Sequence, residues 1–346
     1  MNNTYTEAAS EISPWYYYIT GIVLLFTTTA AIVMNGSIIY LFIFKDRKLL
    51  NRANTHVCFV CLISLITNIA SVPMVIISCF AKHWVFGDTG CIYYAFMISF
   101  SGLGTILILT MFAIDRYILV EFYFLDENSV KYFNILSITG SCTTSFVLAI
   151  FPLLGWNRYT YDGVGVSCAL DMNAEDYNKK SYQITLLVLC FILPIILMLF
   201  CFTRIFSKVK QMINLQTQYD TINTDNRYKV EYDLAITIVS IFVLFIINWT
   251  PYATVMIMCT FTNECPLHPI AASLPGIIAK TAGCFTPLVY LRRNRKIWNS
   301  VLKLYPCYWR KNKKFSVNMR PTDNASREQL PPQAQIELSN FTDLIQ

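Results

Sequence analysis

Seven long stretches of this sequence contain no acidic or basic side chain, apart from a single lysine in the last stretch. A helix that crosses the hydrocarbon core of a bilayer needs about 20 mostly apolar residues, and every stretch is long enough. Because the bilayer core offers no water to backbone amides, such segments must form helices. We therefore predict an all-α membrane protein, a bundle of seven transmembrane helices. The stretches lie between Glu11 and Lys45, Arg52 and Lys82, Asp88 and Asp115, Lys131 and Arg158, Lys180 and Arg204, Asp233 and Glu264, and Glu264 and Arg292.

The distribution of basic residues predicts the orientation of the bundle. With the N-terminus outside the cell, four of the 27 basic residues are extracellular, and Lys280 lies in the membrane. The remaining 22 are on the inner side, as the positive-inside rule requires. The net charge of +6 therefore reflects membrane topology and gives no indication of nucleic-acid binding. The extracellular four are Lys82, Arg158, Lys179 and Lys180.

The predicted organisation is an extracellular tail (residues 1–14), the helical bundle (15–310) and a disordered cytosolic tail (311–346). The first tail lacks a cleavable signal peptide and carries a glycosylation sequon at Asn2. Basic and apolar residues alternate at helical spacing over 294–304, which predicts a short amphipathic helix on the membrane surface. Cys307, just beyond this helix, is a candidate for palmitoylation.

Most of the 12 cysteines lie inside the predicted spans, where a cysteine is usually a small apolar packing residue. Cys91 opens the third span, and Cys168 lies in the outer loop between the fourth and fifth spans. Disulfides persist outside the cell, so we expect these two to be bonded. Cys265 is also predicted to be outside and leaves an alternative pairing open.

Two features suggest a bundle that changes shape. Asp115-Arg116-Tyr117 ends the third span, where an arginine most often only reaches toward lipid headgroups. Glu231 lies at the inner end of the sixth span, at a matching depth in the membrane. Arg116 could therefore bridge the third and sixth spans, and we call this contact the Arg116–Glu231 clamp. Prolines lie within three spans and should kink them, although a membrane helix often tolerates a proline without functional consequence. They are Pro194, Pro251 and Pro287.

These motifs resemble the rhodopsin-like G-protein-coupled receptors and, within them, the opsins. The resemblance covers roughly residues 15–310. Lys280, seven residues before Pro287 of the Pro-x-x-Tyr motif that ends at Tyr290, is its most specific carrier. The other carriers are Phe86-Gly-Asp-Thr-Gly-Cys91, Asp115-Arg-Tyr117, Pro152-Leu-Leu-Gly-Trp-Asn-Arg-Tyr159 and Trp249-Thr-Pro-Tyr252.

The resemblance implies a purpose for Lys280, whose charge would otherwise cost about 2.5 to above 10 kcal/mol at the bilayer centre. In opsins this lysine forms a protonated Schiff base with retinal, and Trp249 and Tyr252 would help to enclose the chromophore. In vertebrate visual opsins the negative counterion of the Schiff base is a Glu three residues after the third-span cysteine, and that position is Tyr94 here. Many other opsins take the counterion from the second outer loop, six residues before its cysteine, which is Asp162 here. A loop carboxylate considered alone is more often merely solvated.

The implied mechanism is photochemical. Light converts 11-cis-retinal to the all-trans form, the Arg116–Glu231 clamp loosens, and a heterotrimeric G protein binds in the inner cleft of the bundle. The resemblance also implies a multi-pass protein of the plasma membrane, in a photoreceptor cell. A loop counterion implies a photoreversible, or bistable, product. Arrestin and a receptor kinase are expected partners of the tail. Four departures from the family pattern weaken the expected internal polar relay and leave signalling strength open. Ser64 stands where the family usually has Asp, Cys142 where it has Trp, Phe202 where it has Tyr, and Thr286 where it has Asn.

Three alternatives remain. A retinal photoisomerase with weak or no signalling would use the same Lys280, whereas an ordinary receptor would pair Lys280 with an anionic ligand. A transporter or channel is disfavoured because no inverted repeat or set of intramembrane charges is evident. We expect no other enzyme chemistry and no metal site, since the three histidines fall on separate segments. These are His56, His83 and His268.

Overall fold

The computed structural model describes residues 12–50, 52–122, 127–172, 176–219, 225–262 and 267–305. The chain divides into two units, of which the first ends at Trp298 and the second begins at Asn299. Asn2, Cys307 and the predicted disordered tail lie outside the described residues, so those three predictions stay untested.

The described residues contain seven helical segments that are long and apolar enough to span a membrane, which confirms the predicted bundle. They are Pro14–Lys45, Asn54–Ala81, Gly87–Glu121, Tyr132–Leu154, Tyr177–Gln211, Tyr232–Phe261 and Pro269–Arg293. The helices themselves are α2 (Pro14–Tyr40), α3 (Arg52–Ala70), α4 (Val72–Ala81), α5 (Gly87–Glu121), α6 (Glu127–Ile150), α7 (Tyr177–Leu187), α8 (Leu193–Tyr219), α9 (Asp225–Phe261), α10 (Pro269–Arg293) and α11 (Arg295–Leu302).

Local irregularities divide several spans in ways that hydropathy did not predict. The second span bends at Ser71, where α3 ends and α4 begins with Pro73 in its first turn. A proline has no N–H to donate and cannot extend the preceding helix regularly. The fifth span widens to a π-helical turn, η4 (Val188–Ile192), just before Pro194. The first span ends in another, η1 (Leu41–Lys45), and the 3₁₀ turns are η2 (Arg47–Leu49) and η3 (Phe151–Leu154).

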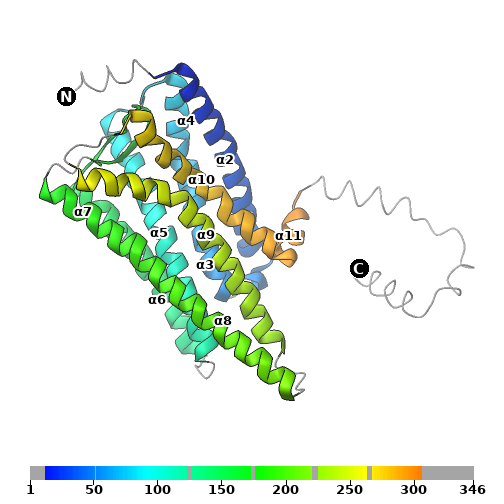
Figure 1. Cartoon of the computed structure of the whole chain (residues 1–346). Coiled ribbons are helices and arrows are strands. Elements are labelled where there is room, and N and C mark those ends of the chain that lie inside the picture. Colours follow the sequence, from blue (N-terminus) through cyan, green and yellow to red (C-terminus); the bar gives the residue numbers. More distant parts are fainter. Residues whose placement is uncertain are drawn as a thin grey trace, which may run out of the picture. The chain divides into compact units, whose positions relative to one another are not determined.

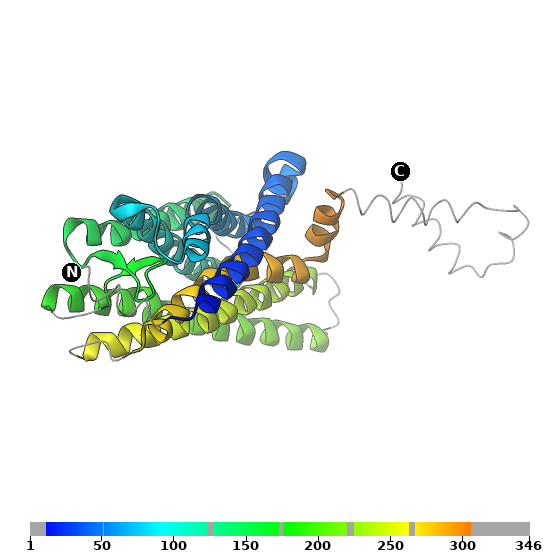
Figure 2. The same ribbon diagram turned by 90° about the horizontal axis from the view of Figure 1, so that it is seen from above.

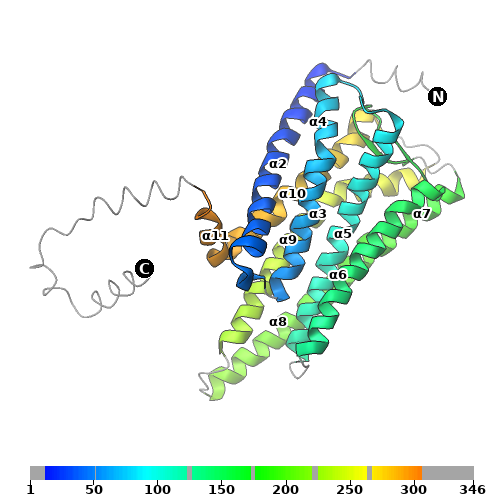
Figure 3. The same ribbon diagram turned by 180° about the vertical axis from the view of Figure 1, so that it is seen from behind.

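A two-stranded antiparallel hairpin lies at the outer end of the bundle. Its strands are β1 (Tyr159–Tyr161) and β2 (Cys168–Leu170), with Tyr161 opposite Cys168. Figure 1 shows the strands at the end where α2 begins, and Figures 2 and 3 show them among the helix ends there. The Cys91–Cys168 disulfide joins β2 to the first turn of α5, which confirms the predicted pairing.

The outer end also contains an ion-pair network that fixes the hairpin. The Asp171 carboxylate, 3% exposed as a residue, lies 2.9 Å from Arg158 Nε and 3.1 Å from Lys179 Nζ. The backbone carbonyl of Asp171 also accepts a hydrogen bond from the Gln183 side chain of α7 at 2.8 Å. The hairpin is therefore tied to α7 as well as to α5.

Most described cysteines behave as the sequence predicted. Seven are free, and six of these are buried in the bundle. Cys259 departs from the prediction because it is disulfide-bonded, although it lies inside the sixth span. Its partner lies outside the described residues.

The short helix after the seventh span has the predicted amphipathic character. Helix α11 begins at Arg295, and its first turn contains exposed basic side chains beside the buried Ile297. The Trp298 amide donates to the Asn294 carbonyl at 2.9 Å, which starts the helix directly after α10.

Candidate functional site

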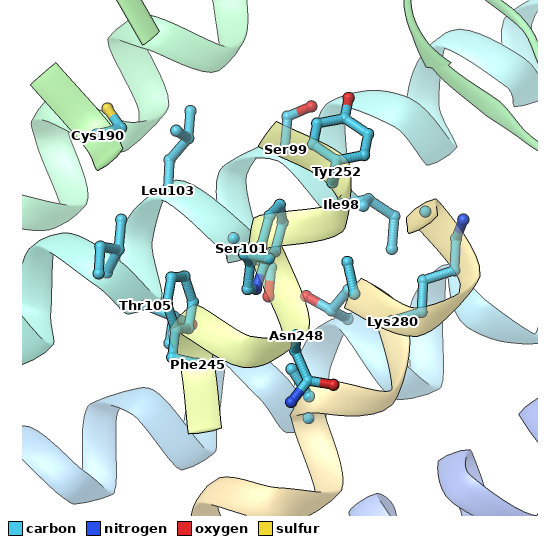
Figure 4. A pocket seen from close by; sticks show the side chains of 18 of the residues that line it. Ile98, Ser99, Ser101, Leu103, Thr105, Cys190, Phe245, Asn248, Tyr252 and Lys280 are labelled. Atoms are coloured by element: carbon cyan, nitrogen blue, oxygen red, sulfur yellow. The ribbon is translucent and has the colours of Figure 1, made fainter. Parts of the chain in front are cut away.

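A cavity of about 200 Å³ lies inside the bundle beneath the hairpin. It is lined by residues of α3, α4, α5, α7, α9 and α10, of η4 and of strand β2. In Figure 4, Lys280 of α10 and Cys190 of η4 lie at opposite sides of this cavity, with Tyr252 and Asn248 of α9 between them. Lys280 is the only charged residue among the described residues that line it. The cavity is thus lined mostly by apolar groups and contains one amine, that of Lys280.

The Lys280 ammonium is held by neutral groups. Its Nζ donates to the Ser167 hydroxyl at 3.3 Å and lies 5.8 Å from the centre of the Tyr94 ring. The Ser167 hydroxyl in turn donates to the Tyr94 hydroxyl at 3.3 Å. Tyr94 is completely buried, so its ring presents a desolvated face to the cation.

Asp162 reaches the same group of residues through the hairpin loop. Its carboxylate accepts a hydrogen bond from the Ser167 amide at 3.3 Å, and its own amide donates to the Ser167 carbonyl at 2.9 Å. Ser167 thus contacts Asp162 through its backbone and Lys280 through its side chain. Burial raises the pKa of the Asp162 carboxyl to about 6, while the positive charge of Lys280 acts in the opposite direction.

Aromatic side chains of α9 form one wall of the cavity. Trp249 stacks on Phe245 with ring centres 5.5 Å apart, and Tyr252 meets the indole edge-on at 5.9 Å. All three residues line the cavity. Pro251 lies between Trp249 and Tyr252 and leaves a gap in the hydrogen bonding of α9. The wall is therefore built where the helix is easiest to bend.

Gly102 of α5 allows the Trp249 indole to approach closely. A Cβ atom added at Gly102 would lie 2.4 Å from Cη2 of Trp249, which is closer than atoms can pack. We expect Gly102→Ala to displace Trp249 and lower the free energy of unfolding of the retinal-free protein by about 1–3 kcal/mol. Thermal unfolding in detergent measures this effect.

Gly140→Ala is the matched control for this prediction. Gly140 is also helical and within a span, but a Cβ atom there would have nothing within 4 Å. Gly140→Ala should leave stability unchanged or raise it by about 0.5–1 kcal/mol, because alanine favours a helix. Equal destabilisation by both changes would contradict the role given to the Gly102–Trp249 contact.

The predicted inner-end residues are only partly described. Arg116 Nε donates to the Asp115 carboxylate at 3.1 Å, and both residues are buried. The Glu231 side chain lies outside the described residues, so the Arg116–Glu231 clamp stays a prediction. Tyr117 packs edge-on against Phe200 of α8, with ring centres 5.5 Å apart. In the Pro-x-x-Tyr motif, Tyr290 donates to Asn54 of α3 at 2.6 Å, which links α10 to α3.

Ser64 replaces the expected aspartate and joins a neutral polar cluster. Its hydroxyl donates to the Gly283 carbonyl of α10 at 3.3 Å, and Asn35 of α2 donates to the same carbonyl at 3.1 Å. Contact between three helices is thus kept without a carboxylate. The other departures are placed as follows: Thr286 lines the cavity, Phe202 is buried, and Cys142 is half-buried.

Sequence reasoning missed two residues of the site. Ser167 directly precedes Cys168, so a polar residue beside the expected disulfide was an available signal. Gly102 had a weaker signal, a glycine within an apolar span. Among the described residues, no group of three or more His, Cys, Asp or Glu side chains is placed to hold a metal ion.

The fold and the site together define a class, a seven-helix membrane receptor with a ligand cavity beneath an outer hairpin. The family described as 7 transmembrane receptor (rhodopsin family) matches residues 34–290. The chain belongs to this family.

Relatives that match this chain include opsins by name. The chain is 25% identical over 296 residues to Melanopsin of Phodopus sungorus, covering 84% of this chain and 63% of the relative. It is 27% identical over 299 residues to Rhodopsin of Loligo forbesii, covering 84% and 66%. It is 27% identical over 302 residues to Green-sensitive opsin-2 of Psalidodon fasciatus, covering 85% and 83%. These matches confirm the predicted resemblance to opsins and a multi-pass plasma-membrane location.

The fold also matches a solved structure, the crystal structure of squid rhodopsin. The TM-score is 0.78 at 24% identity, covering 93% of this chain and 94% of that chain. This likeness confirms the seven-helix architecture. The chain spans less than two thirds of the length of the melanopsin given above.

Proposed function

We propose that this receptor is activated by light, holds retinal covalently on Lys280 as a protonated Schiff base, and signals to a heterotrimeric G protein. The observation that carries the proposal is the placement of Lys280. It is the one charged side chain lining the described cavity, and a hydrogen-bonded path through Ser167 connects it to Asp162.

The residues present fit this chromophore. An apolar polyene matches the mainly apolar lining of the cavity. Its aldehyde can condense with a primary amine, with release of water. When bound, retinal supplies the light absorption and the change of shape, from 11-cis to all-trans. The half-buried Lys280 amine faces the cavity and has no direct carboxylate partner among the described residues, so it is free to react.

The chain's own residues would stabilise the bound cation and sense the change of shape. Asp162 would provide the negative charge. Ser167 would bond Asp162 through its backbone amide and the nitrogen through its hydroxyl, and the Tyr94 ring would face the nitrogen. Trp249 and Tyr252 would enclose the polyene next to the kink at Pro251. Because Asp162 belongs to the loop and not to α10, it can remain near the nitrogen after isomerisation, which supports a photoreversible product.

Signal transfer would use the inner ends of α5 and α9, where Arg116 and Glu231 lie, and the contact of Tyr290 with Asn54. Arrestin and a receptor kinase are further proposed partners, at a tail outside the described residues. A photoreceptor cell is the proposed site of expression. The polar contacts kept at Ser64 give the photoisomerase alternative no added support.

Absorption and nucleotide exchange test this function together. The protein is purified with 11-cis-retinal, and its spectrum is recorded before and after illumination, alongside light-stimulated GDP release from a G protein. We expect a visible band, a second visible form that light converts back, and faster exchange in light. A visible band with no exchange on any G-protein class would favour the photoisomerase. No band at all would overturn the proposal.

A further inference from the structure

A neutral hydrogen bond joins α9 to α10 next to the two central residues of the cavity. The Thr281 hydroxyl lies 3.3 Å from Oδ1 of Asn248. Thr281 directly follows Lys280, and Asn248 directly precedes Trp249. Figure 4 shows the Asn248 side chain extending from α9 beside the ribbon of α10 that bears Lys280. The pair therefore connects the helix that carries the amine to the helix that carries the indole.

The orientation of the Asn248 amide follows from its second contact. Its Nδ2 donates to the Leu244 carbonyl at 2.7 Å. A flipped amide would place oxygen against that carbonyl, which would be repulsive, so Oδ1 must face Thr281. Asn248 is only 6% exposed, so water does not readily replace a lost partner of Oδ1.

Thr281 has one hydroxyl proton and two acceptors for it. The Ile278 carbonyl of its own helix lies at 2.7 Å, and Asn248 Oδ1 on α9 lies at 3.3 Å. The hydroxyl can therefore give up the bond to α9 without becoming unsatisfied, because the bond to Ile278 remains. Asn248 keeps only its bond to Leu244. Breaking this contact thus costs less than breaking a bond whose two partners are both left unpaired.

The contact also lies close to the weakest point of α9. Pro251, three residues after Asn248, has no N–H and interrupts the helical hydrogen bonding there. A movement of α9 about this point would change the distance between Asn248 and Thr281 directly. Because both groups are neutral, the contact does not depend on pH.

We propose that Asn248 and Thr281 form a latch that favours the resting arrangement of α9 and α10, and that Thr281 transfers its hydrogen bond fully to Ile278 when the helices separate. Both act as positioning residues and need not touch the chromophore. The proposal rests on the proposed signalling function and deepens it, because it names a residue pair that determines the level of signalling in the absence of light.

Nucleotide exchange by the retinal-free protein measures the latch. Thr281→Val removes the hydroxyl at nearly constant volume, and Asn248→Leu removes the acceptor. One neutral hydrogen bond should change the population of the active state about three- to tenfold, so each variant should raise light-independent exchange by that factor. The double variant should exceed neither single variant, because both remove the same contact. Thr281→Ser should behave as the unmodified protein.

Thr250→Val is the matched control. Thr250 is also in α9 and donates to a backbone carbonyl of its own helix, that of Ile246, at 2.7 Å, but its side chain is exposed. Its replacement should leave exchange unchanged. Additive effects of Thr281→Val and Asn248→Leu, or an equal effect of Thr250→Val, would overturn the latch.

Infrared spectroscopy gives a second readout that needs neither light nor a G protein. The Asn248 side-chain carbonyl stretch, assigned by its loss in Asn248→Leu, should move to higher frequency in Thr281→Val and stay in place in Thr281→Ser. An unmoved band would overturn the latch. If no variant stimulates exchange but the band moves, the signalling function fails and the contact itself is supported.

Discussion

Lys280→Ala protein supplied with 11-cis-retinal is expected to show no visible absorption band, whereas the unmodified protein shows one. The variant keeps the cavity but has no primary amine in it, since Lys280 is the only lysine among the described lining residues. Without covalent attachment there is no protonated nitrogen to shift the absorption into the visible. The measurement is the absorption spectrum of the purified protein, repeated after acid denaturation to detect covalently bound retinal.

Lys82→Ala is a closely matched control for this experiment. The Lys82 ammonium lies 5.3 Å from the centre of the Tyr18 ring, much as Lys280 lies 5.8 Å from that of Tyr94. Lys82 is exposed at the outer end of α4 and does not line the cavity. Its replacement should leave the band intact. A visible band retained in Lys280→Ala would place the attachment elsewhere and remove the basis of the proposed function.

The bundle could be predicted from the sequence because membrane insertion is a strong and simple constraint. Each charge-free stretch has one stable solution in hydrocarbon, a helix, so the spans follow from counting residues. The bend at Ser71 and the π-helical turn before Pro194 do not follow, because the sequence shows a proline without showing how neighbouring helices satisfy the freed backbone groups.

The candidate site could be predicted only as far as its separate members. Lys280, Asp162 and Tyr94 were named individually, but their connection depends on Ser167, which is 113 residues from Lys280 in the chain. The register of two strands of three residues each decides which side chain of the loop faces the amine. Hydropathy holds no information on that register. The disulfide expected at Cys168 was the one sequence feature that limited the possible registers.

The internal polar contacts show a different limit. Ser64, in place of an aspartate, suggested a weakened relay, because a carboxylate accepts hydrogen bonds more strongly than a hydroxyl. The structure instead uses a backbone carbonyl, that of Gly283, as the shared acceptor for Ser64 and Asn35. Backbone groups are present at every position, so a sequence gives no indication of which one takes over such a role.

Asp162→Asn is expected to abolish the visible band of the retinal-bound protein at neutral pH and leave near-ultraviolet absorption. A negative charge nearby raises the pKa of a protonated nitrogen by about 1–3 units, and the variant loses that contribution. The band should return when the pH is lowered far enough to protonate the nitrogen without its partner. Asp88→Asn is the control, because Asp88 is an exposed outer carboxylate that accepts a hydrogen bond from the hydroxyl of Tyr161, the residue before Asp162.

The unmodified protein should show a shift of its visible band to longer wavelength in acid, which the variant lacks. Burial raises the pKa of Asp162 from 3.8 to about 6, so its negative charge is present above that pH and is lost below it. A carboxylate beside the nitrogen stabilises the ground state, in which the positive charge is localised there. When the Asp162 carboxylate is protonated, this stabilisation is lost and the excitation energy falls. The band should therefore move to longer wavelength, with a midpoint near pH 6. If Asp162→Asn keeps both the neutral-pH band and this transition, another group must balance the charge, and the path through Ser167 has no electrostatic role.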